Sequence, residues 1–190
     1  MITTYKAAPD IDVLTSSFPV PGFGLIPINA FVLHARDGEA LWFADSLVTY
    51  KATGIETRGG LTVAEVRAPR GAGSPRHRHH NEDEAWYVME GELTFWLGDE
   101  ERSVGAGSFV FGPRGIDHRF RVDSEEANFL LLLTPAGFEE FTRACGWPAT
   151  SLTMPPADLP ERDIALLEDA ARRHGLDIDP EPTTSPKLTT

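Results

Sequence analysis

Short strand-like segments, separated by turn residues, run from about Glu39 to Thr134 and limit the fold more than any other feature of this sequence. Each is a run of alternating or continuous apolar residues, rich in β-branched and aromatic side chains, which is typical of antiparallel strands. Turn residues lie between them, as at 90–92 and 112–115. The segments predicted as strands are 41–44, 61–67, 85–90, 93–97, 108–111, 118–122 and 128–133.

The sequence pattern changes after Thr134. A helix is predicted over 135–145, because this segment begins with a proline, carries acidic residues early and ends before Gly146. A second helix is predicted over 159–174, with Gly175 as its stop. Many short strands followed by helices indicate an all-β fold with C-terminal helices, either a small barrel or a sandwich, and the pattern alone does not separate these two.

The 190 residues favour one domain of ordinary size with additions at both ends. We divide the chain into N-terminal extension strands over 1–36, a barrel over 37–134, and helices with a tail over 135–190. The first segment contains one extended stretch, 26–34, and the last dozen residues are expected to be a frayed tail.

Composition excludes several classes of function. The sequence has 17 Lys and Arg against 29 Asp and Glu, a formal net charge of −12, so neither nucleic acid nor a membrane surface is expected as a partner. A hydrophobic content of 41% and a charged content of 24% argue against a disordered chain, and no apolar run reaches the roughly 18–20 residues of a membrane span. The single Cys145 excludes an intrachain disulfide, and the first ten residues lack a secretory pattern, so a cytoplasmic location is expected.

The histidines are unevenly distributed, and four of the six lie between 76 and 118. His77 and His79 are two residues apart, so on a strand both side chains project from the same face. Glu84 follows at the start of one predicted strand, and His118 begins another. If these segments pair within one sheet, three imidazoles and a carboxylate converge inside it.

Three imidazoles with one carboxylate suit a divalent Fe, Mn, Co, Ni, Cu or Zn ion, and the absence of thiolates argues against a purely structural zinc site. We therefore predict one divalent transition metal per chain. The alternative is that this Arg-rich, polar stretch is a solvated loop without an ion. Glu82 and Asp83 are interpreted as solvated loop charges, and His34, His80 and His174 receive no role.

The residues around these histidines follow two spaced motifs. The first, G-x5-H-x-H-x4-E-x6-G, is matched by Gly71, His77, His79, Glu84 and Gly91. The second, G-x5-P-x-G-x2-H, is matched by Gly107, Pro113, Gly115 and His118. Over 53–134 the chain thus resembles the cupin superfamily. One departure is Val122, which stands where the second motif usually carries a non-liganding asparagine.

The resemblance implies a cupin jelly-roll β-barrel with an internal metal whose ligands are His77, His79, Glu84 and His118. Within the superfamily, the segments 84–92 and 134–141 resemble small single-domain cupins of the bacterial quercetin 2,3-dioxygenase type. That resemblance implies a metal-dependent dioxygenase that cleaves a flavonol or a related enolisable aromatic with O₂. Glu84 is then also the catalytic base that takes the proton of the substrate hydroxyl.

A flat substrate needs apolar walls, and strand alternation points Trp86, Val88 and Phe120 inward with the ligands, whereas Tyr87 faces away. These three are predicted to bind substrate, although ordinary core packing explains them equally well. Two other functions stay open, a non-catalytic cupin that binds a metal or small molecule and a cupin isomerase or cyclase. Exposed strand edges and the apolar N-terminal segment predict a homodimer.

Overall fold

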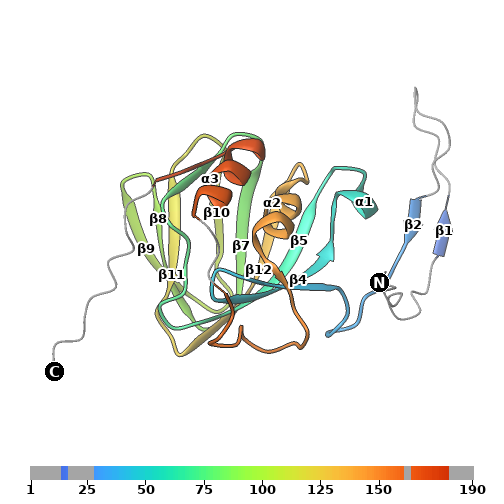
Figure 1. Ribbon diagram of the computed structural model, residues 1–190, viewed down its shortest axis with the longest axis horizontal. Coiled ribbons are helices and arrows are strands. Elements are labelled where there is room, and N and C mark those ends of the chain that lie inside the picture. The colour runs from blue at the N-terminus through green and yellow to red at the C-terminus, as the bar shows by residue number, and fades with distance from the viewer. Residues whose placement is uncertain (1–13, 17–27, 161–163, 180–190) are drawn as a thin grey trace.

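The computed structural model describes residues 14–16, 28–160 and 164–179 (Figure 1). The described strands form two large antiparallel sheets and a separate ribbon of β1 (Leu14–Ser16) and β2 (Ile28–Ala30). The predicted jelly roll is confirmed, with its strands in two separate sheets and not in one closed barrel. No helix among the described residues is both long and apolar enough to cross a membrane.

The larger sheet has seven strands, and its central strands β5, β7 and β12 supply much of the core. In spatial order it consists of β10 (Phe109–Gly112), β7 (Asp83–Glu90), β12 (Glu126–Thr134), β5 (Thr62–Pro69), β4 (Ser46–Ala52), β3 (Glu39–Phe43) and β13 (Trp147–Pro148).

The smaller sheet has five strands and joins the last described strand of the chain to strands from its middle. In spatial order it consists of β14 (Leu176–Ile178), β6 (His77–His79), β11 (His118–Val122), β8 (Glu92–Leu97) and β9 (Glu100–Gly105).

Alternation of apolar side chains builds the core between the sheets. Every second residue of β5 and of β12 is buried, so one face of each strand is covered. Phe129 on β12 is 1% exposed, and from the smaller sheet Leu93 and Phe95 are 0% and 1% exposed. These residues belong to one buried cluster, which fixes the strand register because a slip by one residue would turn the apolar face outward.

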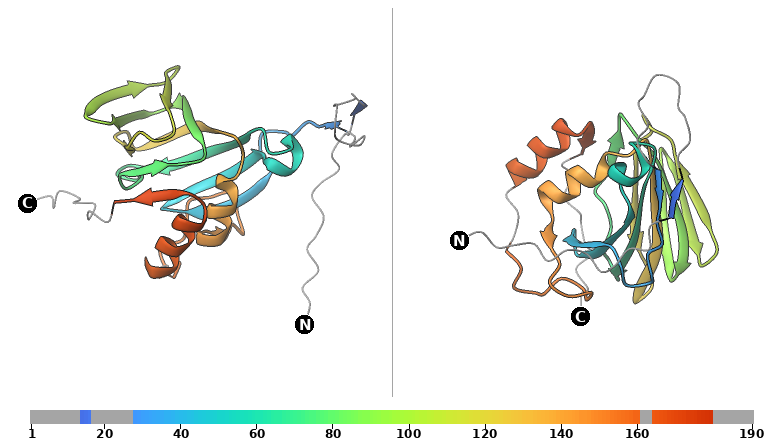
Figure 2. Two further views of the ribbon diagram at one scale, coloured as in Figure 1. Left: turned by 90° about the horizontal axis from the view of Figure 1, so that it is seen from above. Right: turned by 90° about the vertical axis from the view of Figure 1, so that its right-hand side faces the viewer.

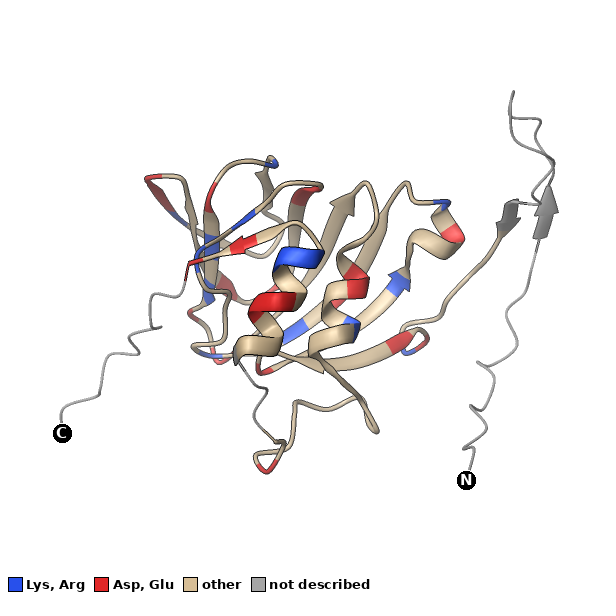
Figure 3. Cartoon of the chain, turned by 45° about the horizontal axis from the view of Figure 1, so that its top comes forward, with Lys and Arg blue, Asp and Glu red and all other residues tan. Residues whose placement is uncertain are grey.

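In the part of the chain that the structure describes, three helices accompany the sheets: α1 (Gly54–Thr57), α2 (Phe138–Cys145) and α3 (Ile164–Arg173). Figure 2 shows α2 and α3 together on one side of the strands. Phe141 and Cys145 of α2 and Ala170 of α3 are buried in the core cluster. Both helices also carry acidic and basic residues, and charges of both signs are spread over the molecule (Figure 3).

Each segment predicted as a strand overlaps an observed strand, but three strands within the predicted barrel, β4, β6 (His77–His79) and β9, were absent from the predicted segments. β4 is buried on both faces from Ser46 to Tyr50, so it has no alternation to recognise. β9 is a largely exposed edge strand that begins with two glutamates, so it lacks an apolar face.

Both predicted helices exist with shifted boundaries. α2 begins at Phe138 because Gly137, with a φ of +149°, lies outside the helical region. α3 is described from Ile164 to Arg173, and Gly175 is followed directly by β14, a strand that the sequence did not predict. The frayed tail predicted after it lies outside the described residues.

Candidate metal centre

The short strand β6 carries two histidines on one face. His77 and His79 are 9% and 0% exposed, whereas Arg78 between them pairs with Asp117, its Nε lying 2.7 Å from Oδ1. Strand alternation therefore places both imidazoles on the inner face, as the sequence predicted.

Strands on both sides hold β6 in place. On one side, His118 of β11 is the register partner of His77. On the other side, Leu176 of β14 is the partner of His79, and the His80 amide donates to the Gly175 carbonyl at 2.8 Å. β6 is thus held between β11 and β14, the last described strand of the chain.

The other two members of the cluster come from both sheets. His118 begins β11 beside β6, and Glu84 lies near the start of β7 in the larger sheet. Their exposures are 2% and 4%. Gly112 of β10 is the register partner of Glu84, and a Cβ there would lie 3.2 Å from the Trp86 ring, so the glycine leaves room for the packing around the cluster.

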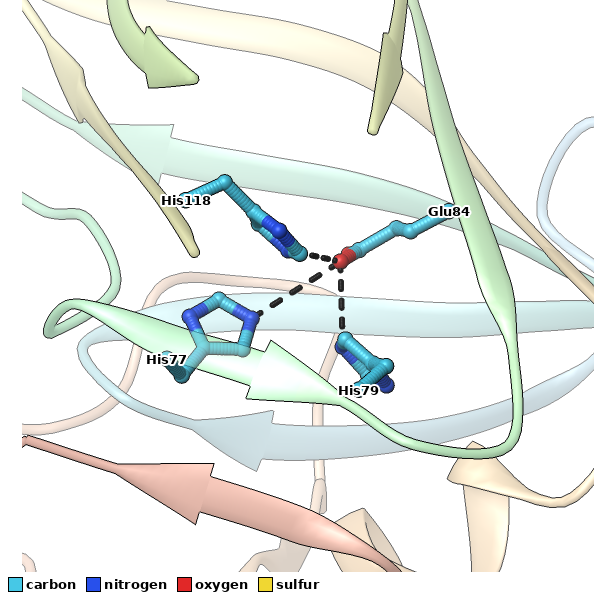
Figure 4. Close-up of side chains that lie close together, drawn as sticks. All are labelled: His77, His79, Glu84 and His118. Carbon is cyan, nitrogen blue, oxygen red and sulfur yellow. Dashed lines mark hydrogen bonds and ion pairs between the residues drawn. The ribbon is translucent and has the colours of Figure 1, made fainter. Parts of the chain in front are cut away.

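The four side chains converge on one point (Figure 4). The Oε2 atom of Glu84 lies 2.8 Å from Nε2 of His118 and 3.1 Å from Nε2 of His79. Nε2 of His77 is 3.7 Å away. One potential donor atom from each of the four residues lies within 4.8 Å of every other. The structure therefore brings together all four residues that the sequence proposed as ligands.

Each imidazole is oriented through its other ring nitrogen. Nδ1 of His77 lies 2.9 Å from the Pro75 carbonyl, and Nδ1 of His118 lies 2.9 Å from the Ile116 carbonyl. Nδ1 of His79 lies 3.1 Å from Oε2 of Glu82. Because carbonyl and carboxylate oxygens only accept hydrogen bonds, these partners place a hydrogen on every Nδ1 and direct every Nε2 at the centre.

Burial and the mutual contacts shift the pKa values of this cluster. Burial lowers the pKa of His77. Burial also opposes the charge on His79, but the carboxylates of Glu82 and Glu84 outweigh it and raise its pKa to about 9. Burial opposes ionisation of Glu84, yet the three histidines outweigh it and hold its pKa well below the ordinary value. The carboxylate is therefore ionised at neutral pH.

The cluster fits a divalent transition-metal ion. Nε2 of His79 is buried and, despite its short distance to Glu84, has no aligned hydrogen-bond partner among the described residues. A buried nitrogen without a partner costs free energy unless something else binds it. Three inward nitrogens and one carboxylate oxygen are a donor set for an ion of this class, which would be held by His77, His79, Glu84 and His118.

A cavity of about 930 Å³ adjoins the cluster and is lined by both His77 and Glu84. Apolar side chains of the larger sheet form part of its wall, and α2, α3 and β14 contribute Phe141, Leu167 and Leu176. Its size is typical of small-molecule sites, which are mostly apolar with a few polar groups. Both predicted helices therefore help to enclose the cavity. This role of the helices was not predicted from the sequence.

Of the three residues predicted to contact the substrate, two line the cavity and one does not. Trp86 and Phe120 line the cavity, and the indole N–H of Trp86 is buried without a hydrogen-bond partner among the described residues. Val88 is 0% exposed and belongs to the core cluster, but it does not line this cavity. Tyr87 is 43% exposed on the opposite face of β7.

The interpretation of Glu82 as a solvated loop charge was wrong. Glu82 is 3% exposed and contacts His79, because the chain turns back between β6 and β7. The sequence feature that could have indicated this contact is the position of Glu82, three residues after His79. Asp83 pairs with Arg114, its Oδ2 lying 2.9 Å from Nη2, and His80 pairs with Asp177 on β14.

Comparison with known proteins agrees with this geometry. Residues 64–134 match the family model described as "Cupin domain". A 125-residue stretch, 66% of this chain, is 30% identical to "Quercetin 2,3-dioxygenase" of Bacillus subtilis. A 56-residue stretch, 30% of this chain, is 34% identical to an uncharacterized protein of Streptomyces coelicolor. The matches span 36% and 53% of these two relatives' own lengths.

Solved structures support the fold alone. The crystal structure of a "predicted oxalate decarboxylase" from Thermotoga maritima superposes with a TM-score of 0.52, covering 55% of this chain and 98% of that one, at 17% identity.

Proposed function

This chain contains a cupin domain, and on that basis we propose that it is a metal-dependent dioxygenase acting on a flavonol or a similar enolisable aromatic. The observation that carries the proposal is the ionised, buried Glu84, which belongs to the candidate metal centre and also lines a largely apolar cavity. The 30% identity to a quercetin 2,3-dioxygenase, whose length this chain matches only in part, supports the same reaction class.

The cavity wall supports a flat, apolar substrate. Phe120 packs against Phe129 with ring centroids 5.4 Å apart, and both line the cavity together with Leu131. Such a surface binds an aromatic ring and excludes water. We propose that Trp86 and Phe120 contact the substrate, with the unpartnered indole N–H of Trp86 donating to a substrate oxygen. Val88 then acts by packing behind the wall.

Glu84 is the proposed base. Its carboxylate is ionised at neutral pH and is therefore in the form that can accept a proton from a substrate hydroxyl, which a bound divalent ion would make more acidic. Glu84 then becomes a neutral acid and the substrate an enolate. His77 and His118, held by backbone carbonyls, keep their Nε2 atoms fixed beside it. A divalent ion, when bound, would supply Lewis acidity to the substrate oxygen and a site for O₂. The apolar wall keeps the electron-rich enolate away from water while it reacts with O₂ and its ring is cleaved.

Oxygen uptake with quercetin tests this function. We expect consumption of about one O₂ per quercetin after loading the protein separately with Ni²⁺, Co²⁺, Mn²⁺ or Fe²⁺, with at least one of these ions active. Phe120→Ala should raise KM, and Tyr87→Phe, on the opposite face of β7, should match the wild type. If metal-loaded protein consumed no O₂ with any of the four ions, the dioxygenase proposal would fail and a binding or isomerising cupin would replace it.

We also propose that the chain forms a homodimer through the outer face of the larger sheet. Phe109 and Phe111 on the edge strand β10 are 64% and 51% exposed, and Tyr87 lies directly opposite Phe109. An exposed aromatic patch at a sheet edge favours pairing with another copy. Light scattering should give the mass of two chains, and Phe109→Lys should give that of one. A wild-type protein that stays monomeric would refute the dimer.

A further inference from the structure

Glu82 is a buried carboxylate in contact with a member of the metal centre. Its exposure is 3%, and its Oε2 lies 3.1 Å from Nδ1 of His79, the nitrogen that faces away from the centre. Burying a carboxylate is costly unless it gains a hydrogen-bonding partner. The contact with His79 is the hydrogen bond that the structure gives this side chain.

His79 differs from the other two imidazoles in the kind of acceptor that it has. His77 and His118 donate from Nδ1 to the neutral backbone carbonyls of Pro75 and Ile116. Only His79 among the three has an anionic side chain as the partner of its Nδ1. A charged acceptor makes a stronger hydrogen bond than a neutral one and increases the electron density on the imidazole.

The segment before α2 is shaped around this pair. A Cβ at Gly137 would lie 3.2 Å from Oε1 of Glu82, so the glycine leaves the space that the carboxylate occupies. The next residue, Phe138, places its ring 5.3 Å from the ring of His79. The C-terminal region therefore packs against both the imidazole and its acceptor.

We propose that Glu82 is a positioning residue of the metal centre: by accepting the Nδ1–H of His79 it fixes the tautomer and orientation of that ring and makes it the most electron-rich nitrogen ligand. The inference rests on the proposed metal centre. Glu82 is then a second carboxylate near the ion, in addition to the ligand Glu84, and it lowers the net charge around the ion.

Metal affinity, measured without turnover, tests the role of Glu82. Competition with a chromophoric chelator for Co²⁺ or Zn²⁺ should show affinity reduced about 10–100-fold in Glu82→Ala. Glu82→Gln keeps an accepting oxygen but no charge, so its affinity should fall between that of the wild type and that of Glu82→Ala. The matched control is Asp83→Asn, which removes a neighbouring carboxylate that pairs with Arg114 instead. Its affinity should equal that of the wild type.

A spectroscopic readout separates positioning from general loss of stability. The visible absorption bands of the Co²⁺-loaded protein should shift in Glu82→Gln and stay unchanged in Asp83→Asn, even if both variants unfold at the same temperature. Unchanged affinity and spectrum in Glu82→Gln would overturn the role of Glu82, as would equal losses in Glu82→Gln and Asp83→Asn. A wild-type protein that binds neither ion would refute the metal centre itself, which is a different result.

Discussion

The region 64–134, which matches the cupin family model, and the region that follows it, 135–179, contribute differently to the same centre. All four candidate ligands lie in the first region: Glu84 and His118 come from strands that the sequence pattern indicates, and His77 and His79 from the short strand β6. The described part of the second region, 135–160 and 164–179, contributes no residue to the candidate ligand set, but α2, α3 and β14 help to enclose the cavity, and β14 pairs with the strand that carries two ligands. The first region therefore supplies the donor atoms, and the second supports the strand that carries two of them and part of the cavity wall.

This difference leads to distinct expectations for the two regions. Substitution of a ligand should abolish metal binding even when the C-terminal helices stay folded, because the ion binds to the donor atoms themselves. Substitutions in the C-terminal region should reduce stability first and metal affinity second, because they act through the position of β6.

The largest effect is expected from loss of a ligand. His118→Ala should lower the bound metal from about one ion per chain to below roughly a tenth, because only three donors remain and the buried Glu84 loses its nearest imidazole. Elemental analysis of purified protein measures this, with circular dichroism as a check on folding. The control is His34→Ala, which removes an exposed histidine outside the matched domain. Equal metal content in the two variants would remove His118 from the ligand set.

The next effect concerns the contacts of α2 with the segment that precedes residue 64. Glu139 of α2 is 3% exposed and accepts hydrogen bonds from the Thr62 hydroxyl at 2.5 Å and the Gly54 amide at 2.6 Å. Burial opposes its ionisation, but these bonds outweigh it and lower its pKa. Glu139→Gln should therefore cost about 1–3 kcal/mol of unfolding free energy at pH 7.

The sign of the pH dependence follows from the lowered pKa of Glu139. The Glu139 carboxylate binds a proton less readily in the folded protein than in the unfolded chain. The stability that the ionised carboxylate contributes is therefore complete above the ordinary glutamate pKa of about 4.3, and it is lost as the pH falls below that value. Urea unfolding from pH 7 to pH 3 should show the wild type and Glu139→Gln converging on the acid side. A difference that is constant or grows toward pH 3 would contradict this account.

The smallest effect tests the coupling between β14 and the centre. Gly175 has a φ of +73°, and a Cβ there would lie 2.4 Å from the Asn81 side chain, so Gly175→Ala should cost about 1 kcal/mol. Gly107→Ala is the matched control, since Gly107 has a φ of +85° and nothing within 4 Å of an added Cβ. We expect both variants to lose stability, but only Gly175→Ala to lose metal affinity, by about threefold to tenfold.

Chelator competition on these two glycine variants measures the difference. If the two variants kept equal metal affinity, the C-terminal strand would have no part in holding β6, and the contrast between the two regions would reduce to stability alone.

Sequence reasoning reached the parts of the molecule that local pattern encodes. The alternation in β5 and β12 and the His77–His79 spacing each follow from the two-residue repeat of a strand. The jelly roll and the full set of four ligands were instead implied by the resemblance of the two spaced motifs to cupins. The division into three segments stays a prediction.

Contacts that depend on how distant segments pack were not predictable. β9 is a charged edge strand and β14 is a three-residue strand, so neither carries an apolar pattern long enough to recognise. Glu82 lies in a polar stretch, and its burial depends on the turn between β6 and β7 and on the approach of Gly137 and Phe138. Such burial is a property of the assembled fold.

X-ray absorption spectroscopy of the Co²⁺-loaded protein tests the central claim most directly. We expect about one ion per chain with only nitrogen and oxygen neighbours, and multiple scattering that corresponds to three imidazoles. His79→Ala should reduce either the occupancy or the number of imidazoles. A spectrum with one imidazole or none, or with sulfur, would contradict a centre built from His77, His79, Glu84 and His118.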